Sequence, residues 1–498
     1  MAAVKLEGAL EIKQKSLAAV KWTYFQTLIP RFITPVTTIV LARLLSPVDF
    51  GLVAVATTTL SLLQIFQDFG MSKALIQSDE NQQDVFNAVF WTNLARILIL
   101  YALLVFAAPM IAMFFNNSSA TPIVRILGLK LIFDAFGAVH RNALIRGIHF
   151  KRLFYVSMPS FLVPLCLTVP LAYLGYGVWS LVIGELASVF LSTLLLWTAL
   201  SWRPTFHVNP DVTRRILVFG FWVTIEALAA WFYVQGDNAI VGRFFSTREF
   251  GVYVVSYNTV VMVMAIILAP LSSIAYPAFS RIRKDRALLA STLLDAIRLS
   301  ALASLPAGVG MLLVARPAIS ILFGSKWSGM EFILGTLALA QALSWIVNVN
   351  PDAYRAVGSP DIVSKFQMAK LLYTVPAYLA AAQFSLPSFV YVKLAVVVVG
   401  VCLWFFLMFK TFPVTPRDLA EHLRTPFAAT TGMALCVLGV DTLLKTSLDP
   451  PELLELTILV STGIGVYIVL LLTLDKKLFR RLSRLVLASI ESKKGPPA

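Results

Sequence analysis

The sequence predicts an all-α integral membrane protein of about 14 transmembrane helices, built from two related six-helix lobes and two additional C-terminal helices. Its 498 residues are 58% hydrophobic and only 13% charged, with a mean hydropathy of +0.81. A soluble domain carries about 25% charged residues. Apolar segments of about 20 residues, enough to cross a bilayer as a helix, recur along the whole chain. They are too long and too continuously apolar for the alternating strands of a membrane barrel.

A motif that occurs twice divides the chain into two halves. Residues 42–52 read Ala-Arg-Leu-Leu-Ser-Pro-Val-Asp-Phe-Gly-Leu, and residues 242–252, 200 positions later, read Gly-Arg-Phe-Phe-Ser-Thr-Arg-Glu-Phe-Gly-Val. Each copy lies between long apolar segments and holds an arginine, a serine, an acidic residue and a Phe-Gly pair at matching places. Internal repeats of this kind are common among membrane transporters. We therefore expect two similar helical bundles.

Apolar length delimits the predicted spans, with boundaries defined to about 2–4 residues. The first six belong to an N-terminal lobe at 1–205, the next six to a C-terminal lobe at 206–424, and the last two to residues 425–475, followed by a basic tail at 476–498. The predicted spans lie near 17–42, 51–70, 86–110, 122–146, 154–174, 177–200, 214–236, 251–274, 292–321, 331–350, 367–384, 387–410, 426–445 and 453–474.

The net charge of +15 comes mainly from alternate short connections and the C-terminal tail. Basic residues gather near 146–152, 203–215 and 281–286, whereas the connection at 446–455 is acidic. Basic connections of membrane proteins lie in the cytoplasm. This pattern predicts a multi-pass protein with both termini in the cytoplasm and an even number of spans. Membrane orientation therefore explains the charge, and no nucleic-acid partner is expected.

Several kinds of chemistry are not expected. The three cysteines, Cys166, Cys402 and Cys436, lie inside apolar segments without a CxxC pair, which predicts small buried hydrophobic side chains. The four histidines are too scattered for a metal site. No connection holds a DxD-type cluster or a phosphate-binding GxxxxGK[ST] motif. We expect a protein that is not an enzyme and has no metal or organic cofactor.

Polar residues recur at helical spacing in the first predicted span. A charged side chain at bilayer depth costs about 2.5 kcal/mol or more unless it meets water or a partner. Arg31 lies near the middle of the span, so the pattern favours a functional cavity over a snorkelling or intrahelically paired arginine. Steps of three and four place on one helical face Tyr24, Thr27, Arg31, Thr34 and Thr38, with Lys21 at its edge.

The next three spans also carry charges. Asp68 is near the cytoplasmic end of the second span, where the spacing fits an interfacial acid and a cavity residue equally well. Arg96 lies in the third span. Lys130, Asp134 and Arg141 share a face of the fourth. Lys130 and Asp134 have the spacing of an intrahelical ion pair, and a pair that lines a cavity has the same spacing.

Acidic residues dominate the remaining intramembrane charges. Glu185 stands alone in the sixth span, while Glu226, Asp237 and Asp352 lie on polar faces of the seventh and tenth. The cations of the first half suit a negatively charged head group such as a phosphate or diphosphate. The carboxylates of the second half, Glu226, Asp237 and Asp352, suit a titrating or ion-coupling role, with a proton or Na⁺ as the coupling ion.

Two sets of motifs resemble those of the bacterial polysaccharide transporters, the Wzx-type oligosaccharide flippases. The resemblance covers about residues 10–425. In the first half the matching residues are Ala42-Arg43-Leu44-Leu45, Pro47, Phe50-Gly51, Phe69-Gly70 and Ala74-Leu75-Ile76-Gln77. In the second half they are Asp237-Asn238, Val241-Gly242-Arg243, Phe250-Gly251, Tyr253 and Pro277-Ala278-Phe279-Ser280-Arg281.

This resemblance implies membership of the multidrug/oligosaccharidyl-lipid/polysaccharide (MOP) superfamily, whose members form a V of two six-helix lobes around a central cavity. It implies a flippase that moves an undecaprenyl-diphosphate-linked repeat unit across the bacterial inner membrane, by alternating access, for exopolysaccharide, capsule or O-antigen synthesis. Basic cavity residues would hold the diphosphate. Arg31 matches a cavity arginine typical of the superfamily, whereas Arg43 and Arg243 are expected to serve loop structure. Implied partners are the lipid-linked oligosaccharide, membrane lipids, and a polysaccharide polymerase with its chain-length machinery.

Two alternative functions remain open. A MATE-like drug/cation antiporter of the same superfamily would be expected to have a cavity dominated by carboxylates and aromatic residues. The first-half cations argue against it, although Asp68 and Asp134 also enter the expected cavity. A membrane polymerase or ligase would need a long periplasmic loop with catalytic residues, and no connection exceeds about 25 residues.

Overall fold

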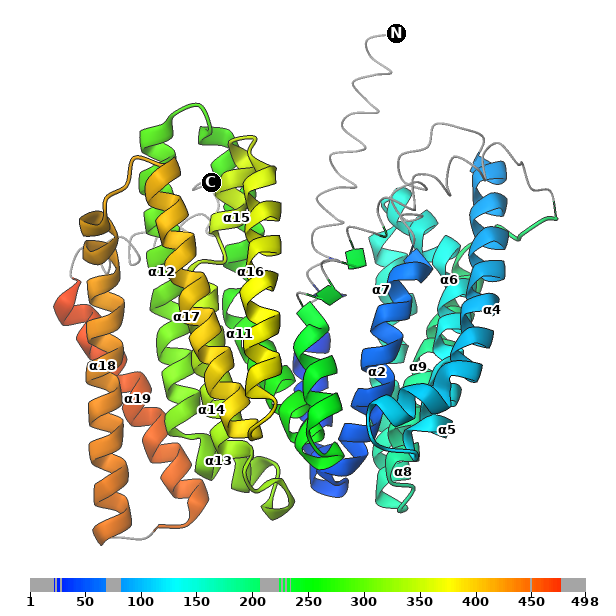
Figure 1. The fold of residues 1–498 in the computed structure, drawn as a ribbon, viewed down its shortest axis with the longest axis horizontal. Helices are drawn as coiled ribbons and strands as arrows, with labels where there is room; N and C mark the ends of the chain where they lie inside the picture. Colours follow the sequence, from blue (N-terminus) through cyan, green and yellow to red (C-terminus); the bar gives the residue numbers. More distant parts are fainter. Residues whose placement is uncertain are drawn as a thin grey trace, which may run out of the picture. The chain divides into compact units, whose positions relative to one another are not determined.

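The computed structural model describes residues 29–68, 82–206, 234–447 and 450–475, and the single positions 22, 25, 26, 224, 227, 228, 231 and 232. Within these residues the chain is helical between short connections and contains no strand (Figure 1). Ten of the described helices are long and apolar enough to cross a membrane. The all-α, multi-pass architecture is therefore confirmed. The spans expected near 17–42 and 214–236 lie partly outside the described residues.

The chain divides into two compact units, Met1–Val255 and Ser256–Ala498. The first unit also contains the helical residues 29–44 and 234–244. Its named elements are α2 (Pro47–Asp68), α4 (Gln82–Phe114), α5 (Ala120–Leu127), α6 (Leu129–Arg146), α7 (Phe150–Val163), the π-helical turn η1 (Pro164–Thr168), α8 (Val169–Tyr173), α9 (Val178–Ala199) and the start of α11 (Thr247–Ile282).

The second unit contains the rest of α11 and the C-terminal helices. Large apolar residues fill one part of its interior, among them Phe279, Tyr354 and Met408. Arg298 of α12 forms an ion pair with Asp475 at the end of α19. The elements are α12 (Arg286–Leu313), α13 (Ala315–Leu322), the short turn η2 (Ser325–Trp327), α14 (Met330–Ile346), α15 (Asn350–Ala356), α16 (Pro360–Ala381), α17 (Leu386–Thr411), α18 (Pro416–Ser447) and α19 (Glu452–Leu474).

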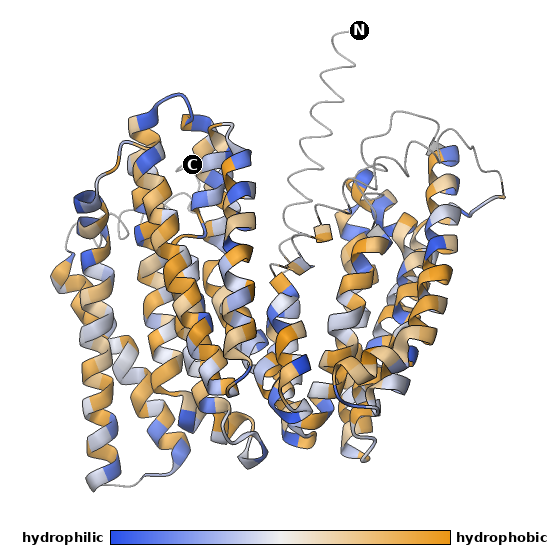
Figure 2. Cartoon of the chain, viewed as in Figure 1, coloured by the Kyte–Doolittle hydropathy of each residue, from blue (hydrophilic) through white to orange (hydrophobic). Residues whose placement is uncertain are grey.

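Helix surfaces are apolar, as lipid exposure requires. Hydrophobic residues predominate along the helices in Figure 2, and many hydrophilic ones gather at helix ends and connections. Phe106 and Met110 of α4 are 81% and 72% exposed. Cys166, Cys402 and Cys436 are exposed as well, so the prediction that they are buried is wrong. The prediction assumed that an apolar side chain is more stable in the protein interior than on the surface. That holds in water, whereas in lipid a small apolar side chain is as stable on the surface as inside.

The repeated sequence motif forms the same helix start in both copies. The Ser46 hydroxyl donates to the Asp49 carboxylate at 2.7 Å, and the Asp49 amide donates back to the Ser46 hydroxyl at 3.4 Å. Ser246 and Glu249 make the equivalent bonds at 2.7 and 3.3 Å. These are reciprocal capping boxes, which satisfy amide groups that a helix leaves unbonded at its N-terminus. The motif therefore sets where α2 and α11 begin.

Contacts around the second motif confirm the expected structural role of Arg243. Its guanidinium donates to the Phe114 carbonyl oxygen at 3.0 Å and to the Asn116 side-chain oxygen at 2.7 Å. The Asn116 amide group in turn donates to the Arg243 carbonyl oxygen at 3.0 Å. Arg243 thus fixes the end of α4 against the connection that precedes α11.

The span expected near 122–146 consists of two helices, α5 and α6, that meet at Gly128. A Cβ atom at Gly128 would come within 2.7 Å of the Leu104 side chain of α4. This charged stretch remains within the bundle because α6 places its polar residues on an interior cavity, described next.

Candidate functional site

A polar cavity of about 710 Å³ lies inside the first unit, between residues 29–44, α2, α6, α7, η1 and α9. Its volume is in the range of small-molecule binding sites, about 300–1,000 Å³. The lining residues include the hydroxyl-bearing Thr34, Thr37, Thr38, Ser157, Ser160, Thr168, Ser188 and Ser192 and the charged Asp134, Arg141 and Glu185.

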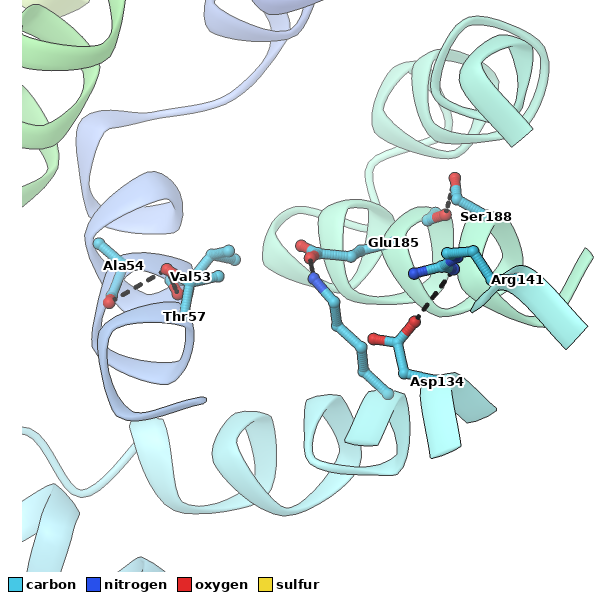
Figure 3. Close-up of polar contacts among 9 residues, drawn as sticks. Val53, Ala54, Thr57, Asp134, Arg141, Glu185 and Ser188 are labelled. Carbon is cyan, nitrogen blue, oxygen red and sulfur yellow. Dashed lines mark hydrogen bonds and ion pairs between the residues drawn. The ribbon is translucent and has the colours of Figure 1, made fainter. Parts of the chain in front are cut away.

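Two ion pairs bring charge to this cavity. Within α6, Arg141 Nη2 lies 3.7 Å from Asp134 Oδ1 (Figure 3). Between α6 and α9, Lys130 Nζ contacts Glu185 Oε1 directly. Asp134, Arg141 and Glu185 line the cavity themselves, and Lys130 reaches it through Glu185. Two cations and two carboxylates therefore meet in this part of the first unit.

Lys130 makes its ion pair with Glu185 of α9. The pair within α6 that the sequence spacing allowed, between Lys130 and Asp134, is therefore not the one that forms. Glu185, isolated in the sequence, is in fact paired. The reason is tertiary: α9 packs against α6, where Thr193 donates to the Phe133 carbonyl oxygen at 2.9 Å. Sequence spacing shows which residues share a helix face, but it does not show which helix lies opposite that face.

Three hydroxyl groups of the lining donate their hydrogens to backbone carbonyl oxygens of their own helices. Thr37 donates its hydroxyl hydrogen to the Ile33 carbonyl oxygen at 2.9 Å, and Ser160 donates to that of Ser157 at 2.6 Å. Ser188 likewise donates to Gly184 at 2.9 Å. Because these hydrogens are used within the helices, the hydroxyl oxygens remain as hydrogen-bond acceptors. Such a surface suits a ligand rich in hydroxyl donors, as a sugar is.

Two other cations expected in a cavity, Arg31 and Arg96, are not among the described residues that line this one. Arg31 is half-buried, one turn before Thr34, and is not among the described residues that line the 710 Å³ cavity. Arg96 donates to the Gln67 carbonyl oxygen at 2.7 Å and to Asn93 Oδ1 at 2.9 Å, which links α4 to the end of α2. Lys21 lies outside the described residues.

Charges within the described part of this cavity balance. Lys130 and Arg141 are matched by Glu185 and Asp134. This differs from the expected positive lining, because Glu185 comes from α9, and the spacing of residues within one helix does not show which helix packs against it. The binding roles of Arg31, Lys21, Arg96, Lys130 and Arg141 stay predictions.

Two of the expected ion-coupling acids, Asp237 and Asp352, have local partners within the described residues. Asp237 accepts hydrogen bonds from the Tyr253 hydroxyl at 2.7 Å and from the Asn238 amide at 2.9 Å. Asp352 pairs with Arg355 at 3.2 Å. The Asp68 side chain and Glu226 lie outside the described residues. Coupling to a proton or Na⁺ through any of these acids stays a prediction.

The second unit holds a cavity of a different kind. About 530 Å³ in volume, it lies between α11, α12, α18 and α19, and its lining includes Pro306, Gly310, Leu459 and Gly463. Its described lining carries no charged residue. The described linings of these two cavities therefore differ in polarity.

Sequence analysis also missed a buried lysine in the second unit. Lys393 of α17 is 8% exposed, and its ammonium lies 4.5 Å from the centre of the Tyr257 ring. A cation over an aromatic face is stabilised electrostatically. The sequence feature that could have identified it is a lysine within the long apolar span predicted near 387–410.

Comparison with known proteins places the chain among polysaccharide biosynthesis proteins. The family described as "Polysaccharide biosynthesis protein" matches residues 40–331, more than half of the chain. The succinoglycan biosynthesis transport protein ExoT of Rhizobium meliloti (strain 1021) is 28% identical over 313 residues, 62% of this chain and 62% of ExoT. The chain thus spans less than two thirds of that relative.

Two further relatives are matched over more of their length. The teichuronic acid biosynthesis protein TuaB of Bacillus subtilis (strain 168) is 24% identical over 432 residues, 86% of this chain and 89% of TuaB. The lipopolysaccharide biosynthesis protein WzxC of Escherichia coli (strain K12) is 22% identical over 378 residues, 76% of this chain and 77% of WzxC.

Solved structures show the same fold. The lipid II flippase MurJ in its inward closed conformation matches 92% of this chain and 100% of its own, with a TM-score of 0.74 and 16% identity. An inward-facing multidrug resistance MATE family transporter of the MOP superfamily matches 79% of this chain and 98% of its own, with a TM-score of 0.57 and 16% identity.

Proposed function

Because the chain belongs to the polysaccharide biosynthesis protein family, we propose that it flips a lipid-linked oligosaccharide across the bacterial inner membrane. The substrate is a repeat unit on undecaprenyl diphosphate, destined for exopolysaccharide, capsule or O-antigen. Relatives named for succinoglycan transport, teichuronic acid synthesis and lipopolysaccharide synthesis support this proposal. The lipid II flippase that shares the fold supports it as well.

The observation that carries the proposal is the polar cavity of the first unit. An oligosaccharide diphosphate needs acceptors for its sugar hydroxyls and cations for its phosphates. The cavity offers both, through its serine and threonine oxygens and through Lys130 and Arg141. It does so within a bundle whose outer surface is apolar. Such an arrangement shelters a polar head group within the membrane.

Transport then proceeds by alternating access, with the substrate chemically unchanged. The cavity would accept the head group from the cytoplasmic leaflet and release it at the periplasmic leaflet. Both termini would face the cytoplasm, in agreement with the basic connections near 146–152, 203–215 and 281–286. A polymerase and its chain-length machinery would consume the product outside.

A second candidate is a MATE-like drug/cation antiporter. The observation in its favour is that Asp134 and Glu185 both line the cavity, because carboxylates attract cationic drugs. Against it, each carboxylate is already paired with a cation. The flippase is therefore the better explanation of the same geometry.

Reconstituted vesicles can separate the two functions. The full-length protein is incorporated with a fluorescent polyprenyl-diphosphate oligosaccharide, and the fraction of head groups accessible to an external quencher is followed over time. We expect flipping by the wild type and no uptake of ethidium. Ethidium transport without flipping would favour the antiporter instead.

Arg141→Ala tests whether the cavity takes part in flipping. Loss of one charge-assisted contact, worth about 1.5–3 kcal/mol, should slow flipping about tenfold or more. The matched control is Arg125→Ala, which removes an exposed arginine of α5 whose Nε donates to the Val105 carbonyl oxygen and which does not line the described cavity. Arg31→Ala tests the arginine that the family resemblance places in the cavity, and its effect is measured as the amount of surface polysaccharide relative to the abundance of the protein. Equal flipping by Arg141→Ala and wild type would remove the cavity from the mechanism.

A further inference from the structure

Lys130 and Arg141, the cations that the described residues bring to the first-unit cavity, each have a carboxylate partner. We propose that Glu185 is an internal counter-ion, which pairs with Lys130 while the cavity is empty and releases it when a phosphate or diphosphate enters. The proposal rests on the proposed function for the class of ligand. It adds that the empty substrate site has no net charge, and that an entering anion displaces a carboxylate from its cation.

Exposure of the Lys130–Glu185 pair makes the exchange feasible. The two side chains are 21% and 30% exposed, and Glu185 lines the cavity. An entering anion can therefore reach Lys130 from the side on which Glu185 stands. A purely structural ion pair between α6 and α9 would not need to lie on a cavity wall.

The second pair is open to the same ligand. Arg141 Nη2 and Asp134 Oδ1 are 3.7 Å apart, beyond the 2.7–3.2 Å of a normal N–H···O hydrogen bond. A guanidinium carries five N–H donors, so a contact with one carboxylate oxygen does not exhaust them. A diphosphate has oxygens on two phosphorus atoms and can contact Lys130 and Arg141 together.

The empty state explains why a counter-ion is present. A cation without a partner in a low-dielectric interior is strongly destabilising, because its desolvation is not compensated. Glu185 supplies the compensation until the ligand does. Asp134 cannot neutralise both Lys130 and Arg141, since it carries a single charge. Removal of the Glu185 charge therefore leaves the four-residue cluster at a net charge of +1.

Binding of inorganic pyrophosphate to the purified full-length protein in nanodiscs tests the proposal. Glu185→Gln keeps the size of the side chain and removes its charge. We expect its dissociation constant for pyrophosphate, measured by titration calorimetry, to be about tenfold lower than that of the wild type. The double variant Lys130→Gln/Glu185→Gln restores the charge balance and should bind no more tightly than the wild type.

A matched control removes a carboxylate elsewhere. Asp361→Asn breaks the ion pair with Lys365 on α16, which lies in the second unit and is largely exposed. Pyrophosphate affinity should not change in this variant. If Glu185→Gln does not fold, Asp134→Asn applies the same change of net charge through the other pair, and it too should tighten binding.

Two results distinguish this proposal from the flippase proposal. A folded Glu185→Gln protein that binds pyrophosphate no more tightly than the wild type overturns the counter-ion role, even if the wild type flips lipid-linked sugar. Tighter binding in Glu185→Gln supports the counter-ion role, even if the wild type fails to flip that substrate.

Discussion

Gly51 and Gly251 lie where the first turns of α2 and α11 approach each other too closely for any side chain. A Cβ atom on Gly51 would lie 2.0 Å from the Thr247 carbonyl oxygen, and one on Gly251 would lie 1.8 Å from the Pro47 carbonyl oxygen. Both obstacles are backbone atoms, so no side-chain rotation can relieve the clash. We therefore expect Gly51→Ala to destabilise the protein.

The magnitude follows from the cost of overpacking, typically about 1–3 kcal/mol and occasionally more. Gly251→Ala should have a similar effect. The double variant should lose less stability than the sum of the two, because the first methyl group has already forced the helix starts apart. Thermal unfolding of the purified protein in mild detergent, followed by intrinsic fluorescence, measures the change as a lower Tm.

Gly439→Ala is the matched control. Gly439 lies within α18, and nothing described lies within 4 Å of a Cβ atom placed there. Alanine is favoured over glycine inside a helix by up to about 1 kcal/mol. Gly439→Ala should therefore leave Tm unchanged or raise it. A Gly51→Ala protein as stable as the Gly439→Ala protein would refute the close approach of the two helix starts.

Two further predictions concern stability. Ser46→Ala and Ser246→Ala each remove a capping hydroxyl, and each should lower the free energy of unfolding by about 1 kcal/mol, measured by thermal unfolding. Ser359→Ala is the control, because Ser359 lies at a helix start but makes no side-chain cap, and it should cost much less. Equal losses in all three variants would contradict the capping role. Asn87 of α4 makes two hydrogen bonds with Thr205, at 2.6 and 3.0 Å. Asn87→Ala should therefore lower the free energy of unfolding by about 1–3 kcal/mol and speed the hydrogen exchange of backbone amides at 200–206. Unchanged exchange there would contradict the docking of this segment on α4.

Several features of the protein follow from the sequence because they depend only on local chemistry. Long apolar segments predict membrane helices, since hydrogen bonding within the helix satisfies the backbone wherever the segment lies. The repeated motif predicts a recurring local structure, and its Ser-to-acid spacing is that of a capping box. Arg243 was correctly expected to serve loop structure, because it belongs to that motif.

The charge of the candidate site was decided by the tertiary structure. Spacing placed Lys130, Asp134 and Arg141 on one helix face, but it could not show that α9 brings Glu185 to Lys130. Nor could it show that Lys393 lies beneath Tyr257. Periodicity along a helix is written in the sequence, whereas the pairing of charges from different helices depends on which faces pack together. Only the folded chain therefore shows whether an intramembrane charge is balanced.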